Sequence, residues 1–322
     1  MKTLVKDEGK AGVMYEFAEA LGVKAEGRTI HIPKSKGGGF ITFMRIDDDF
    51  RVMIRNYYLK EQMVMERINK LGADKYISFS FNDVFEPFEK SEKVTAQFQQ
   101  PKVVVFSETV SSVLTFPSHT FFRSINIAVN QSYLQKMLDN VRHPLITRII
   151  ENKEHFVFES NVTSNMIKCA NDLISEKVNE GLETLFFKIK CEELLCYLFN
   201  KLMERKDEPI SKFHIDDIKA IYKIKEHLQS HLDTAPNIGN LAIEVGMSEP
   251  KLRKLFRQIF GKGVFEYYQS LRMQQAAQLL REERLSVSEV GYKLGFTNLS
   301  HFSRVFEEYI GMKPKKWSVT MQ

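Results

Sequence analysis

The pattern of hydrophobic and polar positions changes character along this chain of 322 residues. Between residue 27 and about residue 130, short segments rich in β-branched and aromatic residues, such as GFITFMRI and FRVMIRNYYL, are separated by clusters of Gly, Pro, Asp and Asn. This pattern predicts short strands joined by turns. Many short strands at such spacing are typical of a barrel or a sandwich. We therefore expect a β-barrel over about residues 27–130.

From about residue 131 the apolar residues recur every three or four positions, which predicts helices as far as residue 206. Asn130 is the expected N-cap of the first helix. The segment ETLFFKIKCEELLCYLFNKLMER carries a broad apolar stripe, formed by Leu185, Ile189, Leu194, Leu195, Leu198 and Leu202. Two interpretations of the stripe are open, because it can pack on the preceding barrel or form the surface of a dimer.

A polar segment with a proline, ERKDEPISKF, follows these helices and marks the expected domain boundary. We predict an N-terminal domain at residues 1–206, a linker at 207–214 and an all-helical C-terminal domain at 215–322. The C-terminal domain begins with DDIKAIYKIKEHLQSHL, in which Asp216 and Asp217 favour a helix N-terminus because of the helix dipole. The predicted fold class is therefore α+β with two domains.

The C-terminal domain contains an internal repeat. NLAIEVGMSEPKLRKLFRQIFG, residues 240–261, matches EVGYKLGFTNLSHFSRVFEEYIG, residues 289–311, first at an offset of 49 positions and then, after one inserted residue, at an offset of 50. Each copy reads as a helix, a turn at a glycine (Gly246 or Gly295) and a second helix with a polar, exposed N-terminal half. This pattern predicts two helix-turn-helix units.

Particular positions of the repeat have a structural reason. Ala242 and Gly291 are small, so that the second helix of each unit can cross at close range. Ser248 and Thr297 stand where a hydroxyl N-cap would start the second helix. The segment beginning at Ser286, SVSE, predicts a capping box at the start of the second unit.

The segment between the two units, VFEYYQSLRMQQAAQLLREE at residues 264–283, has strong helix formers and neither proline nor glycine. About 20 residues of helix span about 30 Å. Successive major-groove faces of B-DNA are about 34 Å apart. A stiff connector of this length is suited to hold two reading helices on one side of a duplex.

Charge supports a polyanionic partner for the C-terminal part. Residues 212–322 contain 17 Lys and Arg and 12 Asp and Glu, whereas residues 1–211 contain 29 of each kind, so the net charge of +5 lies entirely in the C-terminal third. The three cysteines, Cys169, Cys191 and Cys196, lack CxxC spacing. They are expected to be buried structural thiols in a reducing cytoplasm.

The two units, the SLRMQQAAQLL connector, VSEVGYKLGFTNLSHFSRVFEEYIGMKP and Trp317 resemble the AraC/XylS family of bacterial transcription regulators over residues 215–317. The segment FFKIKCEELLCYLFNKL is similar to the subgroup that includes siderophore-responsive regulators. The resemblance implies a cupin-like barrel that binds a small-molecule effector. It also implies double-stranded promoter DNA, RNA polymerase and a second copy of the chain as partners.

The resemblance places base-reading residues in the first turns of each second helix: Lys251, Arg253, Lys254, Leu299, Ser300, His301, Ser303 and Arg304. Residues expected at the DNA backbone are Ser248, Thr297, Lys313, Lys315 and Lys316. Arg or Lys to guanine is the commonest major-groove contact. The effector-binding residues are not predicted.

The sequence does not indicate that the protein is an enzyme. The barrel region contains only His31 and His119, far apart, and lacks the HxH pair of catalytic cupins. We therefore expect no catalytic residues, no metal and no cofactor, although a cupin-type enzyme or a ligand sensor without a catalytic metal is the alternative. No segment approaches the roughly 18 apolar residues of a membrane span, and an acidic pair interrupts the N-terminal segment. A cytoplasmic protein without membrane contact is expected.

Overall fold

The computed structural model describes residues 17–19, 21–67, 76–86, 88, 101–107, 112–151, 156–205, 214–282 and 285–320. The chain divides into two compact units, residues 1–213 and 214–322. The predicted linker at 207–214 lies outside the described residues except for His214. No helix in the described part combines the length and apolar character needed to cross a membrane.

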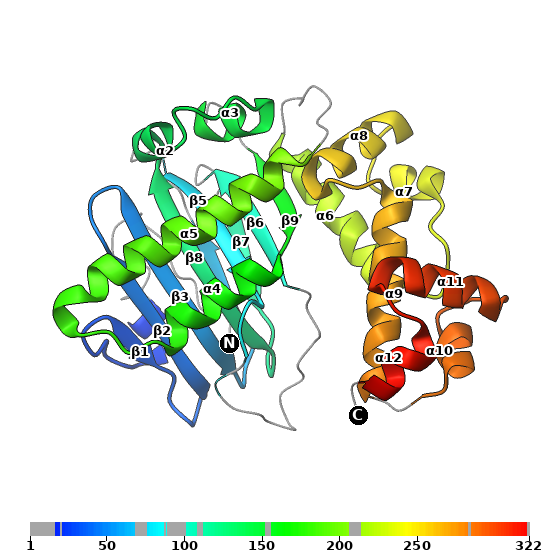
Figure 1. Ribbon diagram of the computed structural model, residues 1–322, viewed down its shortest axis with the longest axis horizontal. Helices are drawn as coiled ribbons and strands as arrows, with labels where there is room; N and C mark the ends of the chain where they lie inside the picture. Colours follow the sequence, from blue (N-terminus) through cyan, green and yellow to red (C-terminus); the bar gives the residue numbers. More distant parts are fainter. Residues whose placement is uncertain are drawn as a thin grey trace. The chain divides into compact units, whose positions relative to one another are not determined.

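The N-terminal unit is built on antiparallel strands (Figure 1). The strands are β1 (Thr29–His31), β2 (Gly37–Arg45), β3 (Phe50–Leu59), β4 (Met63–Arg67), β5 (Tyr76–Asn82), β6 (Lys102–Ser107), β7 (Ser112–Phe116), β8 (Phe121–Asn130) and β9 (Val157–Asn161). Seven of them form a sheet in the order β1-β2-β3-β8-β5-β6-β9, and β4 pairs separately with β7. The predicted barrel is not confirmed, because the sheet of described strands is open, with β1 and β9 at its edges.

One face of this sheet is covered by helices. Phe79 of β5 and Ile127 of β8 are paired in register and fully buried on this face. The ring of Phe199, in α5 (Glu183–Met203), packs edge-on against Phe79 with 5.6 Å between ring centroids. Figure 1 shows α5 and α4 (Ser164–Ser175) crossing in front of the sheet. We call this side the helix-covered face and the other side the opposite face.

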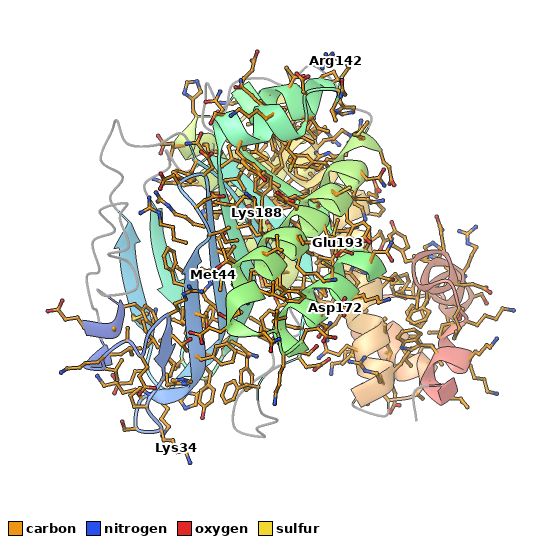
Figure 2. All side chains as sticks on the ribbon, turned by 60° about the vertical axis from the view of Figure 1, so that its left-hand side comes forward. Lys34, Met44, Arg142, Asp172, Lys188 and Glu193 are labelled. Atoms are coloured by element: carbon orange, nitrogen blue, oxygen red, sulfur yellow. The ribbon has the colours of Figure 1, made fainter. Side chains whose placement is uncertain are left out.

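Ion pairs join α5 to its surroundings. Lys190 of α5 lies 3.1 Å from the Asp172 carboxylate of α4 and 3.0 Å from the Glu193 carboxylate of its own helix. Lys188 lies 2.9 Å from the carboxylate of Asp47, which is in the bend between β2 and β3. Figure 2 shows Lys188 and Glu193 on α5 with Asp172 beside them on α4. The position of α5 on the sheet is thus fixed by charge as well as by apolar packing.

The apolar stripe of α5 divides into two parts. Leu194, Leu198 and Leu202 are fully buried in the N-terminal unit, and the contact of the neighbouring Phe199 with Phe79 of β5 supports the packing interpretation for the second half of the helix. Leu185 and Ile189, in the first half, are 56% and 52% exposed. The expectation of buried thiols is confirmed for Cys169 and Cys191 and wrong for Cys196, which is exposed because it faces away from the sheet.

Two short helices come next in the chain: α2 (Gln131–Met137) follows β8 directly, and α3 (Pro144–Glu151) follows α2. The prediction that Asn130 caps the first helix is confirmed, since its side chain accepts a hydrogen bond from the backbone N–H of Ser132. The short strand β9 between α3 and α4 was not predicted. It extends the sheet by pairing with β6.

The C-terminal unit is all-helical in its described part. Its helices are α6 (Ile215–Ser230), α7 (Ile238–Glu244), α8 (Glu249–Phe260), α9 (Val264–Glu282), α10 (Val287–Lys293), α11 (Leu299–Ile310) and α12 (Pro314–Thr320). Figure 1 shows α9 as a long helix, and it is contacted by α6, α8, α10, α11 and α12. Met273 and Leu280 of α9 form one core with Val290 of α10 and Phe302 of α11. The predicted connector helix is confirmed.

Candidate nucleic-acid interface

The repeat in the sequence is reproduced in the helices. α7 and α10 each have seven residues, and they begin at Ile238 and Val287, separated by the predicted 49 positions. α8 and α11 each have 12 residues, and they begin at Glu249 and Leu299, separated by the predicted 50 positions. The inserted residue therefore lies in the second turn. We call α7 with α8 the first helix pair and α10 with α11 the second helix pair.

Glycines form both turns, as predicted. Gly246 and Gly295 have φ values of 66° and 76°, a left-handed conformation that side chains other than glycine adopt only with strain. A Cβ atom built on Gly291 would lie 2.6 Å from Leu299 Cδ2 and 3.3 Å from a ring carbon of Phe302. Gly291 is therefore small because α11 crosses α10 at this point.

The caps of the second pair agree with the sequence in one place and differ in another. The predicted capping box is present, since Glu289 N–H donates to Ser286 Oγ and Ser286 N–H donates to a Glu289 carboxylate oxygen at 2.7 Å. The prediction that Thr297 caps α11 is wrong. Asn298 is the cap and accepts the His301 N–H at 3.0 Å. The inserted residue shifts the cap by one position, from the offset of 49 to the offset of 50.

In the first pair, Ser248 stands at the N-cap of α8, but its side chain makes no capping hydrogen bond. The helix start is instead supported by Pro250 in the first turn, where a missing N–H is not needed. The C-terminal ends of α8 and α11 are alike, because Gly261 and Gly311 both adopt the left-handed conformation.

The predicted base-reading residues lie on exposed faces of α8 and α11. On α8, Lys251, Arg253 and Lys254 are exposed, whereas Leu252 and Phe256 are fully buried. The amphipathic period of this helix thus separates its basic face from its core face.

On α11, Ser300, His301 and Arg304 are exposed and Ser303 is partly exposed. Leu299 is also partly buried, because it lies over Gly291 of α10. The structure therefore brings polar groups together on the first turns of each second helix. Their contacts with DNA stay predictions.

Two of the predicted base-reading residues form ion pairs with carboxylates. Lys251 Nζ lies 2.8 Å from the Asp217 carboxylate of α6, and Arg253 Nη2 lies 3.3 Å from the Glu249 carboxylate one turn earlier. Exposed ion pairs contribute only about 0–1 kcal/mol, so a phosphate or a base can displace these partners. Among the described residues, neither Lys254 nor Arg304 has an ion-pair partner.

The predicted backbone contacts at the C-terminal end are exposed as well. Lys313 precedes α12, and Lys315 and Lys316 lie in its first turn. The helix is held against α9 by Trp317, whose indole N–H donates to the Ala277 carbonyl at 2.9 Å. Thr297 and Ser248 are also exposed. These residues are accessible, and their role at the DNA backbone stays a prediction.

Arg272 of α9 supports the second pair and was not predicted. Its guanidinium donates to the Leu294 carbonyl at the end of α10 and to Gln269 Oε1 at 3.0 Å. It also lies 3.8 Å from the ring centroid of Phe296. Burial lowers the pKa of Arg272 from its usual value. A charged residue on the buried side of a predicted helix is the one signal by which sequence reasoning could have found it.

The chain matches the family model described as a helix-turn-helix domain over residues 241–318, which include α8, the second helix pair and the last four residues of α7. It is 32% identical over 122 residues to the transcriptional regulator GbdR of Pseudomonas aeruginosa, covering 37% of this chain and 33% of that protein. It is 29% identical over 149 residues to the arabinose operon regulatory protein of Escherichia coli, covering 46% of this chain and 50% of that protein. The chain thus spans only a third to a half of the curated relatives that it matches.

Among solved structures, a probable AraC family transcriptional regulator from Rhodopseudomonas palustris is 24% identical, covers 32% of this chain and 98% of its own, and has a TM-score of 0.30. ToxT from Vibrio cholerae is 16% identical, covers 86% of this chain and 99% of its own, and has a TM-score of 0.32. The similarity to siderophore-responsive regulators is tested by none of these proteins and stays a prediction. The family model thus assigns residues 241–318 to a helix-turn-helix domain, and the curated relatives that share this part of the chain are regulatory proteins.

Proposed function

We propose that the whole chain is a sequence-specific regulator of transcription, in which both helix pairs are helix-turn-helix units and α8 and α11 enter the major groove. The observation that carries the proposal is the repeat itself, because two helices of equal length expose polar first turns at equivalent positions. A core helix has no need of such a face. The proposed roles of base reading and backbone contact are those of the residues predicted from the sequence.

The connector helix α9 joins the two helix pairs. Its 19 residues correspond to about 28 Å of helix. Major-groove faces on one side of B-DNA are about 34 Å apart. Because α9 packs against both helix pairs, it holds the two helix pairs at a fixed separation, which supports binding to one face of one duplex.

The two reading helices differ in charge. α8 contains Lys251, Arg253, Lys254 and Arg257 with one carboxylate, whereas α11 contains Arg304 with two. Phosphate neutralisation supplies most of the salt-dependent affinity for DNA. We therefore propose that the first pair supplies more of the general affinity and that the second pair depends more on specific contacts.

We further propose a homodimer that forms through α5. Four exposed residues are spaced by seven positions, namely Leu182, which is the N-cap of α5, and Ile189, Cys196 and Met203 within it. The apolar side chains of Leu182, Ile189 and Met203 are 54%, 52% and 46% exposed. A repeat of seven is the spacing with which two helices pack side by side. Sedimentation of the full chain tests this contact: Ile189→Asp should yield monomers, and a dimer unchanged by this variant would contradict it.

The remaining partners are proposals of the same kind. A regulator of this family is proposed to bind a small-molecule effector in its N-terminal unit and to contact RNA polymerase at the promoter. We also propose that the protein is not an enzyme. An effector changes DNA binding only when it has different affinities for two states of the protein.

The test begins with DNA selected from a random pool by the full chain. Fluorescence anisotropy then compares the selected duplex with a scrambled duplex of equal length over a range of salt concentrations. Arg304→Ala should weaken binding to the selected duplex by roughly 5- to 150-fold, because a good contact to a base contributes about 1–3 kcal/mol. Binding of the scrambled duplex should change little.

Lys315→Ala is the matched comparison, because Lys315 is an exposed cation of the same unit outside the reading helices. This variant should weaken binding of both duplexes evenly and reduce the salt slope by about 1. Equal losses on both duplexes for Arg304→Ala would refute its role in base reading. Failure of the wild type to select any sequence would refute the proposed function.

A further inference from the structure

The opposite face of the N-terminal sheet carries a group of polar side chains at its centre. Arg55 of β3 is paired in register with Ser124 of β8, which in turn is paired with Asn82 of β5. One row along, Asn126 of β8 is paired with Ser80 of β5. Because side chains alternate between the faces of a strand, all five lie on the same face. We call these five residues the polar cluster.

The polar cluster lies inside the unit. Ser80 and Ser124 are buried, and Arg55 and Asn126 are only partly exposed. Apolar side chains surround them on the same face, because Met53 is paired with Asn126, and Val104 with Ser80. A sheet face that only filled a core would carry apolar residues at these central positions.

Within the described part of the chain, Arg55 is a cation without a counter-charge. Its Nε–H donates to Ser124 Oγ at 2.8 Å, and among the described residues its guanidinium has neither a carboxylate partner nor a further hydrogen bond. Burial lowers the pKa of Arg55 from its usual value. Removing a charge from water is costly unless the charge is paired. This position therefore costs stability in the absence of an anion.

Arg123 shows how the same unit treats a structural arginine. It lies on the helix-covered face of β8, where its Nη2 is 2.9 Å from the Asp83 carboxylate and its Nη1 donates to the Phe85 carbonyl at 3.0 Å. The two arginines belong to adjacent rows of the sheet, because Arg123 is paired in register with Asn56, the residue that follows Arg55 in β3. The difference indicates that Arg55 is kept for a ligand and not for the fold.

A second group in the cluster is also unsatisfied. The side-chain oxygen of Asn126 is buried and accepts no hydrogen bond in the described part of the chain. Ser80 and Asn82, by contrast, bond to each other, since Ser80 Oγ donates to Asn82 Oδ1 at 3.2 Å. The cluster thus offers a guanidinium to an anion and an amide oxygen to a hydrogen-bond donor, beside the apolar side chain of Met53.

We propose that the polar cluster is the effector site and that Arg55 binds the carboxylate of a small organic acid with an apolar body. The planar guanidinium presents paired N–H groups that match a carboxylate. The cluster contains one cation, which balances one negative charge, so a singly charged carboxylate fits it better than a phosphate dianion. Asn126 accepts a hydrogen bond from the same ligand. This inference rests on the proposed control by an effector.

The test compares carboxylates with their uncharged amides on the full chain. The probes are benzoate, phenylacetate and octanoate, each with its primary amide, and binding is read from the melting temperature and by titration calorimetry. At least one carboxylate should bind and raise the melting temperature, and its amide should not. Arg55→Met should weaken this binding by roughly 10- to 100-fold, the usual effect of losing a charged hydrogen-bond partner.

Two controls separate ligand binding from folding. Arg45→Met, which removes an arginine paired with Asp48 at the exposed end of β2, should leave carboxylate binding unchanged. Without ligand, Arg55→Met should melt no lower than the wild type, whereas Arg123→Met should melt lower because it leaves Asp83 unpaired in a buried position. Arg55→Lys retains the charge but not the planar pair of donors, and it should also bind the carboxylate more weakly.

Three results would overturn the inference: no carboxylate binds the wild type, the amides bind equally well, or Arg55→Met melts as low as Arg123→Met. Anisotropy with the selected duplex on the same preparations distinguishes a failure of the carboxylate site from a failure of the proposed function. Specific DNA binding with an unimportant Arg55 rejects only the carboxylate site. Carboxylate binding without any specific DNA binding rejects the proposed function.

Discussion

The two turn glycines, Gly246 and Gly295, allow a quantitative test of the repeat. Both have positive φ values, 66° and 76°, so replacement by alanine forces a side chain into the left-handed region at each site. This conformation costs about 1–2 kcal/mol for a residue with a Cβ atom. The surroundings differ, however. A Cβ at Gly246 would meet nothing within 4 Å, whereas a Cβ at Gly295 would lie 1.9 Å from the Asp233 carbonyl oxygen.

The overlap at Gly295 is with backbone and cannot be relieved by rotating a side chain. The segment around Asp233, between α6 and α7, would have to move. Forcing an extra carbon into a packed site costs about 1–3 kcal/mol. We therefore expect Gly246→Ala to lower the free energy of unfolding of the C-terminal unit by about 1–2 kcal/mol and Gly295→Ala to lower it by about 2–5 kcal/mol.

Urea unfolding followed by tryptophan fluorescence measures this difference directly. Trp317 is the only tryptophan of the chain and lies in the C-terminal unit, 6.5 Å from Phe306 between ring centroids. Its emission therefore reports the unfolding of this unit and not of the sheet. Equal losses for the two variants, or a larger loss for Gly246→Ala, would refute the close approach of Gly295 to Asp233.

Three further predictions concern single contacts. Asp217→Asn removes the ion-pair partner of Lys251. In anisotropy at low salt, this variant should bind DNA roughly two- to fivefold more tightly than the wild type, which corresponds to the free energy of an exposed ion pair. Weaker binding would mean that the carboxylate positions the lysine for DNA. Ser286→Ala breaks the capping box and should lower the free energy of unfolding, read from Trp317, by about 1 kcal/mol, whereas no loss would show that the cap is dispensable. Burial raises the pKa of Asp83 to about 6 despite its ion pair with Arg123, so the folded unit holds the proton more tightly than the unfolded chain, in which the pKa of this group is about 4. The stability that this group contributes should therefore fall as the pH rises from about 4 to about 6. Asp83→Asn should remove that dependence in circular dichroism melts of the sheet, and an unchanged pH profile would count against the raised pKa.

The sequence predicted the C-terminal unit more closely than the N-terminal one. The bounds of α8 and α11 could be predicted because helical periodicity and the internal repeat point to the same residues. The cap at Asn298 was missed because the inserted residue lies in the turn, where periodicity gives no register. The ion pair between Lys251 and Asp217 joins residues 34 positions apart, and no local pattern signals such a contact.

In the N-terminal unit, alternation identified most strands but not their arrangement. Strands with apolar residues on both faces need cover on both sides, and a barrel and a covered open sheet satisfy this need equally. β9 was missed because its five residues, VFESN, contain only two apolar side chains between helices. The polar cluster depends on the register of β3, β8 and β5, since Arg55 and Ser124 are 69 positions apart in the chain.

Hydroxyl-radical footprinting of the full chain on its selected duplex tests the central claim most directly. Two protected segments about 10–10.5 base pairs apart, on one face of the duplex, are predicted from two units held by one connector. Arg253→Ala should weaken protection of one segment and Arg304→Ala that of the other. A single protected segment, or two variants that affect the same segment, would contradict reading by both helix pairs.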